Sequence, residues 1–140
     1  MRSARPLLLV EDSPEDALTI QRALGDLGAV ASTVHAPTVE HALAYLRGGT
    51  NEKPALILLD LSRPDTAGIE FLKTAKSDPA LSRIPVVVLS TSQEPQDVLE
   101  SFDLSVAGYI VKPAEYAALV EAVKIIQDYW SLSYLPACHT

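Results

Sequence analysis

Five short apolar segments recur along the chain, and each is followed by a stretch with the residue pattern of a helix. The segments are Leu7–Val10, Thr33–Ala36, Ala55–Leu59, Pro85–Leu89 and Gly108–Val111. Three of them read LLLV, ALILL and PVVVL, without the alternation of a strand that has one wet face. Such runs are typical of strands buried on both faces, as in a parallel sheet.

The stretches between the apolar segments predict helices with recognisable ends. The first helix begins with Ser13 as N-cap and Pro14 at the first helical position, and Gly28 closes it. Further helices are expected over about 38–47, 67–77, 95–104 and 115–130.

This strand–helix alternation predicts an α/β fold with an open, five-stranded parallel sheet and helices on both faces. The flavodoxin-like order 2-1-3-4-5 suits this length, and it makes strands 1 and 3 neighbours at the edge where ligands bind. With 140 residues, the chain fits one domain, expected over residues 1–132, followed by a C-terminal tail over 133–140.

Carboxylates follow two of these strands at the point where each strand ends. Glu11 and Asp12 come directly after strand 1, and Asp60 ends strand 3. Side by side they would repel one another unless a cation intervenes, and a set of oxygen ligands favours Mg²⁺ or Mn²⁺. The alternative is that these acids only begin loops or cap helices.

Two further strand ends carry matching chemistry. Ser90 ends strand 4 with a hydroxyl, and Lys112 follows strand 5 with an ammonium. A hydroxyl, an ammonium and a metal ion around one carboxylate could stabilise a phosphoryl group during its transfer.

The ordered pieces LLLVEDSPED, LILLDL, Gly68, PVVVLSTS and GYIVKP resemble the receiver domain of two-component response regulators over about residues 6–130. The resemblance implies that Asp60 is the phosphoacceptor. It implies that Glu11 and Asp12 are the acidic metal pair, with the backbone carbonyl of Ser62 as a further ligand.

The same resemblance assigns roles on the other side of the site. Lys112 is expected to pair with the phosphoryl group, and Ser90 to be the switch hydroxyl that bonds to it. Tyr109 matches the aromatic residue that turns inward after phosphorylation. The Lys112–Pro113 peptide bond is expected to be cis.

Composition and the end of the chain bear on partners. A formal net charge of −7 disfavours nucleic acid and anionic membranes, and the apolar runs are too short to span a bilayer, so a cytoplasmic protein is expected. We expect a non-enzymatic protein whose output is protein contact or phosphorelay. Residues 128–136 resemble the extension of receivers that partner bacterial phytochrome kinases, which indicates a sensor histidine kinase, a bacteriophytochrome, as the upstream partner.

Two other classes of function stay open. One is a pseudo-receiver that binds partners independently of phosphorylation. The other is a phosphatase of the haloacid-dehalogenase class, which also forms a phospho-aspartate. Those enzymes place an acid/base Asp two residues after the nucleophile, where this chain has Ser62.

The last predicted helix has two apolar stripes. The stripe expected to cover the sheet comprises Tyr116, Leu119, Val123, Ile126 and Trp130. The second has the a/d-like spacing by which helices pair, although isolated exposed apolar residues are also common. With the start of the tail, it predicts a homodimer interface made of Ala118, Ala122, Ile125, Tyr129, Trp130 and Leu132.

Overall fold

The computed structural model describes residues 6–26, 33–49, 53–60, 67–90 and 103–132. Within these ranges the strands are β1 (Leu7–Val10), β2 (Thr33–Ala36), β3 (Leu56–Asp60), β4 (Val86–Ser90) and β5 (Gly108–Val111). The helices are α1 (Pro14–Asp26), α2 (Val39–Arg47), α3 (Ala67–Ser77) and α5 (Tyr116–Leu132). Of the helix predicted over 95–104, residues 95–102 lie outside the described residues.

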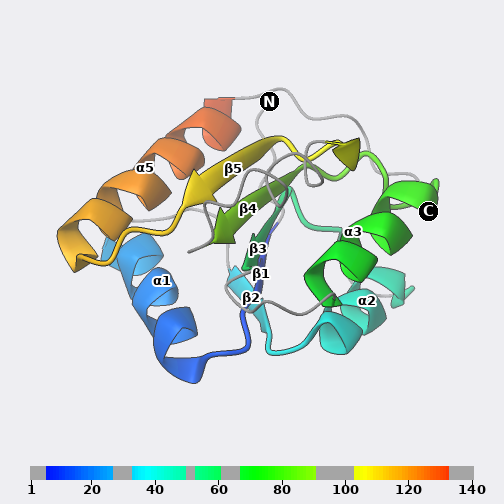
Figure 1. Cartoon of the computed structure of the whole chain (residues 1–140), viewed down its shortest axis with the longest axis horizontal. Helices are drawn as coiled ribbons and strands as arrows, with labels where there is room; N and C mark the ends of the chain where they lie inside the picture. Colours follow the sequence, from blue (N-terminus) through cyan, green and yellow to red (C-terminus); the bar gives the residue numbers. More distant parts are fainter. Residues whose placement is uncertain (1–5, 27–32, 50–52, 61–66, 91–102, 133–140) are drawn as a thin grey trace.

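The strands form one parallel sheet in the order β2-β1-β3-β4-β5, which confirms the predicted flavodoxin-like topology. Helices α1 and α5 cover one face of the sheet, and α2 and α3 cover the other (Figure 1). Val10 pairs with Leu59, so β1 and β3 finish next to each other. We call this end of the sheet, where the strands finish, the carboxyl edge, and the opposite end the amino edge.

Both faces of the sheet are apolar, which explains why the central strands lack alternation. Leu8 and Val10 pack with residues of α2 and α3, such as Leu46 and Phe71. Leu9, between them, packs with residues of α1 and α5 on the opposite face. Successive side chains of a strand point to opposite faces of the sheet. Because helices cover both faces, consecutive residues of a central strand are both apolar.

The first helix begins as its sequence predicts. Pro14 is the first residue of α1, and the backbone N–H of Asp16 donates to Ser13 Oγ at 3.3 Å. The side chain of Thr38 caps α2 in the same way by accepting from the backbone N–H of His41. These caps fix where each helix leaves the carboxyl edge.

Helix α5 buries Leu119, Val123 and Ile126 against the sheet, as predicted. The prediction that Tyr116 also covers the sheet is wrong, because this residue is 42% exposed in the first turn of the helix. There the guanidinium of Arg22 on α1 lies 5.9 Å from the centre of the Tyr116 ring. The side chain of Trp130 lies outside the described part of the structure.

Among the residues that the structure describes, no helix combines the length and the apolar character needed to cross a membrane.

Candidate functional site

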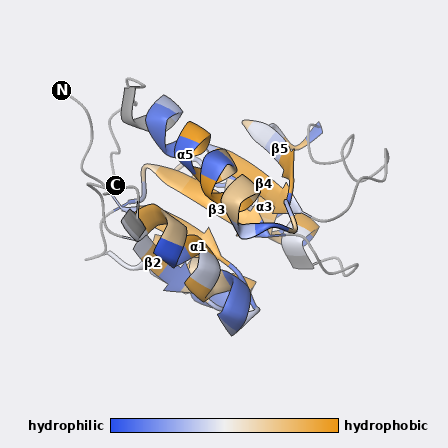
Figure 2. Cartoon of the chain, turned by 90° about the vertical axis from the view of Figure 1, so that its left-hand side faces the viewer, coloured by the Kyte–Doolittle hydropathy of each residue, from blue (hydrophilic) through white to orange (hydrophobic). Residues whose placement is uncertain are grey.

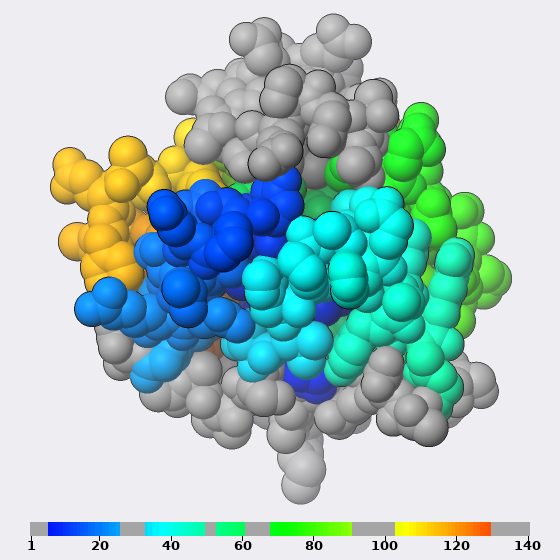
Figure 3. All heavy atoms as spheres, turned by 90° about the horizontal axis from the view of Figure 1, so that it is seen from below, coloured from blue at the N-terminus to red at the C-terminus, as the bar shows by residue number. Residues whose placement is uncertain are grey.

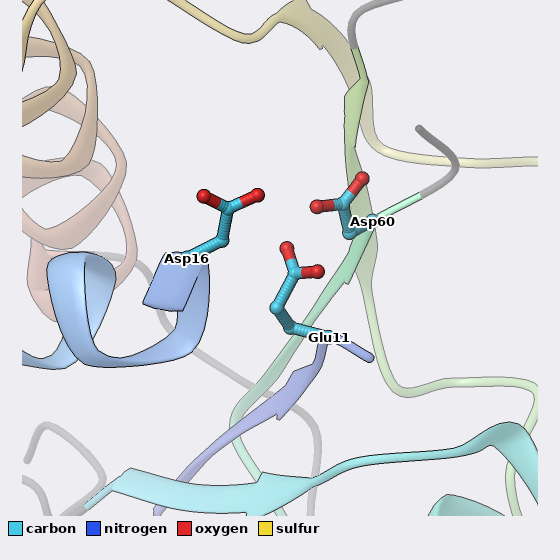
Figure 4. Close-up of side chains that lie close together, drawn as sticks. All are labelled: Glu11, Asp16 and Asp60. Carbon is cyan, nitrogen blue, oxygen red and sulfur yellow. The ribbon is translucent and has the colours of Figure 1, made fainter. Parts of the chain in front are cut away.

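Glu11 and Asp60 meet at the carboxyl edge because each lies two residues beyond an apolar side chain on the α1/α5 face, Leu9 in β1 and Leu58 in β3. Alternation along the strands therefore directs both carboxylates to that face. Asp16, from the first turn of α1, joins them there, and its carboxylate points toward the other two (Figure 4). Oxygen atoms of these three residues lie within 4.8 Å of one another.

Lys112 reaches this cluster from the end of β5. Its backbone N–H donates to the Ser90 carbonyl at 2.7 Å, so the chain continues alongside β4 beyond the end of β5. Its Nζ lies 2.6 Å from Asp60 Oδ2, 2.9 Å from Asp16 Oδ2 and 3.1 Å from Glu11 Oε2. The Lys112 side chain is only 9% exposed, so one largely buried ammonium is shared by three carboxylates.

The electrostatics of the cluster follow from burial and crowding. Burial raises the pKa of Glu11, a hydrogen bond with Asp60 raises it further, and together they bring it from 4.5 to about 8. Burial by itself lowers the pKa of Lys112, but hydrogen bonds to Asp60 and Asp16 and the nearby charges outweigh it, so its pKa is raised above the usual range. The site thus holds a stable cation beside a carboxyl group that binds its proton tightly.

Glu11 is held by its backbone as well as by its side chain. Its N–H donates to the Ala36 carbonyl at 3.1 Å, and its carbonyl accepts from His35 Nε2 at 2.8 Å. Its Oε1 accepts from the backbone N–H of Ser13 at 3.1 Å. Seen from below, the start of α1 lies beside the segment that joins β2 to α2 (Figure 3). The end of β2 therefore fixes the corner at which β1 turns into α1.

The remaining predicted residues divide into three groups. Ser90 is fully buried at the end of β4, and Tyr109 is half-buried in β5 on the α2/α3 face. Asp12 is exposed in the bend that follows β1, and it does not belong to the carboxylate cluster of the described residues. Ser62 lies outside the described residues.

The expectation of a cis Lys112–Pro113 bond is wrong for this structure, whose described part contains no cis peptide bond. The trans form is the ordinary preference of X–Pro bonds.

Asp16 and His35 were both missed by sequence reasoning. Asp16 lies three residues after Ser13, where an acidic residue indicates only the start of a helix. His35 belongs to no sequence motif, yet a polar ring near the end of a strand can donate to a neighbouring backbone carbonyl.

The chemistry of the donor set fits a small, hard cation. Every ligand atom of the cluster is a carboxylate oxygen, and the described part of the structure places no Cys or His among them. Such oxygen sets suit Mg²⁺ and Mn²⁺ rather than zinc. The Lys112 ammonium meets the same oxygens and neutralises part of their charge.

A single parallel sheet with helices on both faces, acids at the ends of β1 and β3 and a lysine after β5 defines a class of signalling domain. Residues 7–124 match the family of the response regulator receiver domain, and the chain belongs to this family.

Two curated proteins are similar over most of their length. Response regulator Rcp1 of Synechocystis is 36% identical over 138 residues, covering 89% of this chain and 87% of Rcp1. The probable methanogenesis regulatory protein FilR2 of Methanothrix harundinacea is 37% identical over 127 residues, covering 89% and 82% of the two chains.

Solved structures agree with this assignment. The phosphorylated cyanobacterial phytochrome response regulator RcpA is 42% identical with a TM-score of 0.87, covering 96% of this chain and 100% of RcpA. The Mn²⁺-bound form of Rcp1 is 36% identical with a TM-score of 0.85, covering 95% and 99%. The chain is therefore related to phytochrome response regulators.

Proposed function

We propose that this protein is a response regulator in which Asp60 accepts a phosphoryl group from a sensor histidine kinase, in a reaction that depends on Mg²⁺ or Mn²⁺. One observation carries the proposal most directly: Lys112 Nζ lies 2.6 Å from Asp60 Oδ2, with the Glu11 carboxylate in the same cluster. A nucleophile, a fixed cation and a second carboxylate are thus together where a phosphoryl group would arrive.

Each residue has a distinct part in this chemistry. A carboxylate oxygen of Asp60 attacks the phosphorus of the kinase's phosphohistidine, and the P–N bond breaks so that the imidazole leaves. The Lys112 ammonium stabilises charge on the equatorial oxygens during this transfer. Glu11 and Asp60 would hold the metal ion, with Asp12 and the Ser62 carbonyl as further predicted ligands. The bound ion would neutralise phosphoryl oxygens that the lysine alone cannot.

The test is incorporation of labelled phosphate from acetyl phosphate or from a phosphorylated histidine kinase. Wild type should take up label with Mg²⁺ and lose nearly all uptake with chelator, and Asp60→Asn should take up none. Asp103→Asn, which changes an exposed carboxylate before β5, serves as the matched control and should label like wild type. Uptake by Asp60→Asn at wild-type stoichiometry would overturn the assignment of the phosphoacceptor.

The same assay separates the other classes of function. A pseudo-receiver predicts no Mg²⁺-dependent label on wild type from any donor. A phosphatase of the haloacid-dehalogenase class predicts continuing turnover of a small phosphate ester, whereas a non-enzymatic receiver predicts at most one phosphoryl group per chain.

For the upstream partner we favour a bacteriophytochrome kinase, supported by the likeness to RcpA and Rcp1. The test compares early transfer rates from a bacteriophytochrome kinase and from an unrelated histidine kinase at equal concentration. Faster transfer from the unrelated kinase would contradict this pairing. Output by protein contact or phosphorelay, and a cytoplasmic location, stay predictions.

The proposed switch couples Ser90 to Tyr109. Val88 pairs with Tyr109 in the sheet, and Ser90 is two residues beyond Val88, so the two side-chain positions share the α2/α3 face. A bond from Ser90 to the phosphoryl group would free space for the tyrosine to turn inward. Ser90→Ala should keep its label but lose most of the change that beryllofluoride produces around β5. An equal change in both proteins would refute the coupling.

The proposed homodimer uses the second stripe of α5. Ile125 is 61% exposed and Tyr129 is 62% exposed, with Ala118 and Ala122 on the preceding turns. Hydrophobic and hydrophilic positions alternate along this helix (Figure 2). An exposed apolar stripe of this kind is typical of a partner site, and a symmetric pair would use it on both chains. Trp130 and Leu132 stay predicted members, because their side chains lie outside the described part.

Sedimentation tests the dimer. Wild type should sediment as a dimer at micromolar concentration, and the double variant Ile125→Glu, Tyr129→Glu as a folded monomer. Leu18→Glu on α1, at a side chain that is 66% exposed, is the matched control and should remain dimeric. A monomeric wild type, with and without beryllofluoride, would rule out this interface.

A further inference from the structure

Asp16 differs from the other two carboxylates of the cluster in its exposure and origin. Its side chain is 47% exposed, against 0% for Glu11 and 2% for Asp60. It comes from a helix rather than from a strand end, and its position is fixed by the cap that Ser13 provides to its backbone N–H. It still lies 2.9 Å from Lys112 Nζ, within the range of a strong ion pair.

The three carboxylates differ in whether a bound cation would compete with their ion pair to Lys112. All three carboxylates could offer an oxygen to a cation. Because Glu11 and Asp60 are almost fully buried at the ends of their strands, we assign a divalent cation to them, and a bound cation would compete with the ammonium for their oxygens. Asp16 is the partner that Lys112 can keep while that competition occurs. In the unphosphorylated, metal-bound protein, Asp16 would therefore hold the ammonium at the carboxyl edge.

After phosphorylation, the ion pair between Asp16 and Lys112 becomes unfavourable. The phosphoryl group adds negative charge at Asp60, whose oxygens lie within 4.8 Å of an Asp16 oxygen. It also needs the Lys112 ammonium, which Asp16 binds. Asp16 then repels the new charge and competes for the cation that should neutralise it.

We propose that Asp16 is a positioning residue that retains Lys112 in the unphosphorylated protein and opposes the phosphorylated state. The inference rests on the proposed function and extends it, because one residue would strengthen the binding of the cation and weaken the binding of the phosphoryl group. Asp16 strengthens cation binding by adding negative charge and by drawing Lys112 away from Glu11 and Asp60. It weakens the binding of a phosphoryl group for the two reasons given above.

The experiment measures two affinities of Asp16→Asn by calorimetry: Mg²⁺ alone, and beryllofluoride at saturating Mg²⁺. We expect Mg²⁺ to bind roughly threefold more weakly and beryllofluoride roughly fivefold more tightly, since a half-exposed charge at this distance is only partly screened. Glu15→Gln is the matched control, because it removes the same charge from an exposed residue of the same helical turn. It should change both affinities by less than about twofold. Asp16→Glu keeps the charge and should stay close to wild type.

The two directions make the outcomes decisive. A general structural role would weaken both ligands, and that result would overturn the inference. So would unchanged beryllofluoride affinity in Asp16→Asn while wild type binds the ligand normally; the proposed function would then stand. If wild type itself binds no beryllofluoride with Mg²⁺, the proposed function fails, and the inference fails with it.

Discussion

Each end of the sheet holds a lysine that is withdrawn from solvent in part, and the two lysines have different kinds of partner. At the carboxyl edge, the Lys112 ammonium contacts three carboxylates. At the amino edge, Lys76 in the last turn of α3 donates to the backbone carbonyls of Ser82 and Ile84, at 3.4 and 3.2 Å. Among the described residues, no carboxylate forms an ion pair with Lys76.

Lys76 and Lys112 show that burial alone does not mark a functional lysine. Burial lowers the pKa of Lys76, and burial alone would lower the pKa of Lys112 as well, but the carboxylates reverse the direction there. Lys53 resembles Lys76, since its ammonium donates to the Leu46 carbonyl at the end of α2. Carbonyls close corners of the chain permanently, whereas carboxylates can exchange an ammonium for a metal ion. Exchangeable partners, rather than burial, mark the carboxyl edge as the functional end.

The largest expected effect comes from replacing each lysine by methionine. Lys112→Met leaves two buried carboxylates without their cation and should lose about 2 kcal/mol of unfolding free energy without metal. Mg²⁺ should restore much of this loss, because it can neutralise the same oxygens, but beryllofluoride binding should be abolished. Lys76→Met should lose about 1 kcal/mol through unsatisfied carbonyls, with or without Mg²⁺. Denaturant unfolding with and without Mg²⁺ measures both.

The contrast would break in two ways. One is equal stabilisation of both variants by Mg²⁺, and the other is loss of beryllofluoride binding by a folded Lys76→Met protein. Either result would mean that the amino edge takes part in the site and is not only a structural corner.

The next effect in size is the pH dependence of cation binding. The pKa of Glu11 is raised from 4.5 to about 8, so the metal-free protein holds a proton that Mg²⁺ must displace. Affinity for Mg²⁺ should therefore rise between about pH 6 and pH 8, by at most about tenfold per unit. Calorimetry in buffers of different ionisation enthalpy should detect the released proton.

The raised pKa of Glu11 also makes the stability of the metal-free protein depend on pH. A proton bound more tightly by the folded state favours folding fully below the unfolded pKa of 4.5, and this contribution is lost as the pH rises through about 8. The metal-free protein should thus become less stable across that window. Glu11→Gln should flatten both pH profiles; a profile like that of wild type would show that another group titrates.

The fold was largely predictable because burial on both faces leaves a direct mark on a strand. Leu56–Asp60 and Val86–Ser90 are central strands, and their continuous apolar runs predicted them to within a residue. The side of α5 that meets the sheet was predictable from Leu119 onward by helical periodicity. The prediction that Tyr116 covers the sheet was wrong because the first turn of α5 lies beside α1. Helical periodicity does not show where along its length a helix contacts the sheet.

The site was predictable where alternation along a strand decides it, and less so where a helix returns to it. Glu11, Asp60 and Lys112 lie at the ends of β1, β3 and β5, and they meet as expected. Asp12 is adjacent to Glu11 in sequence, but it is exposed in the bend after β1 and lies outside the cluster, and its metal role stays a prediction. Asp16 reaches the cluster only because α1 leaves β1 at a particular angle, which the sequence does not state.

The smallest expected effect concerns His35, which combines features of both ends of the sheet. It donates to a backbone carbonyl, as Lys76 does, but that carbonyl belongs to Glu11 at the carboxyl edge. A carbonyl oxygen only accepts, so His35 must carry its proton on Nε2. His35→Gln places an amide N–H at similar reach, whereas His35→Leu keeps comparable bulk and removes the donor.

If this bond only closes a corner, His35→Leu should lose about 1 kcal/mol of stability and bind Mg²⁺ like wild type, as a variant of Lys76 would. We expect more than that, because the bond fixes the backbone that presents the Glu11 carboxylate to the cation. Mg²⁺ should bind His35→Leu roughly threefold more weakly, and His35→Gln should recover most of the affinity. Calorimetry at a pH above the Glu11 transition keeps proton competition out of the comparison. Equal affinity in all three proteins would place His35 with Lys76, as a residue that holds the chain and does not tune the site.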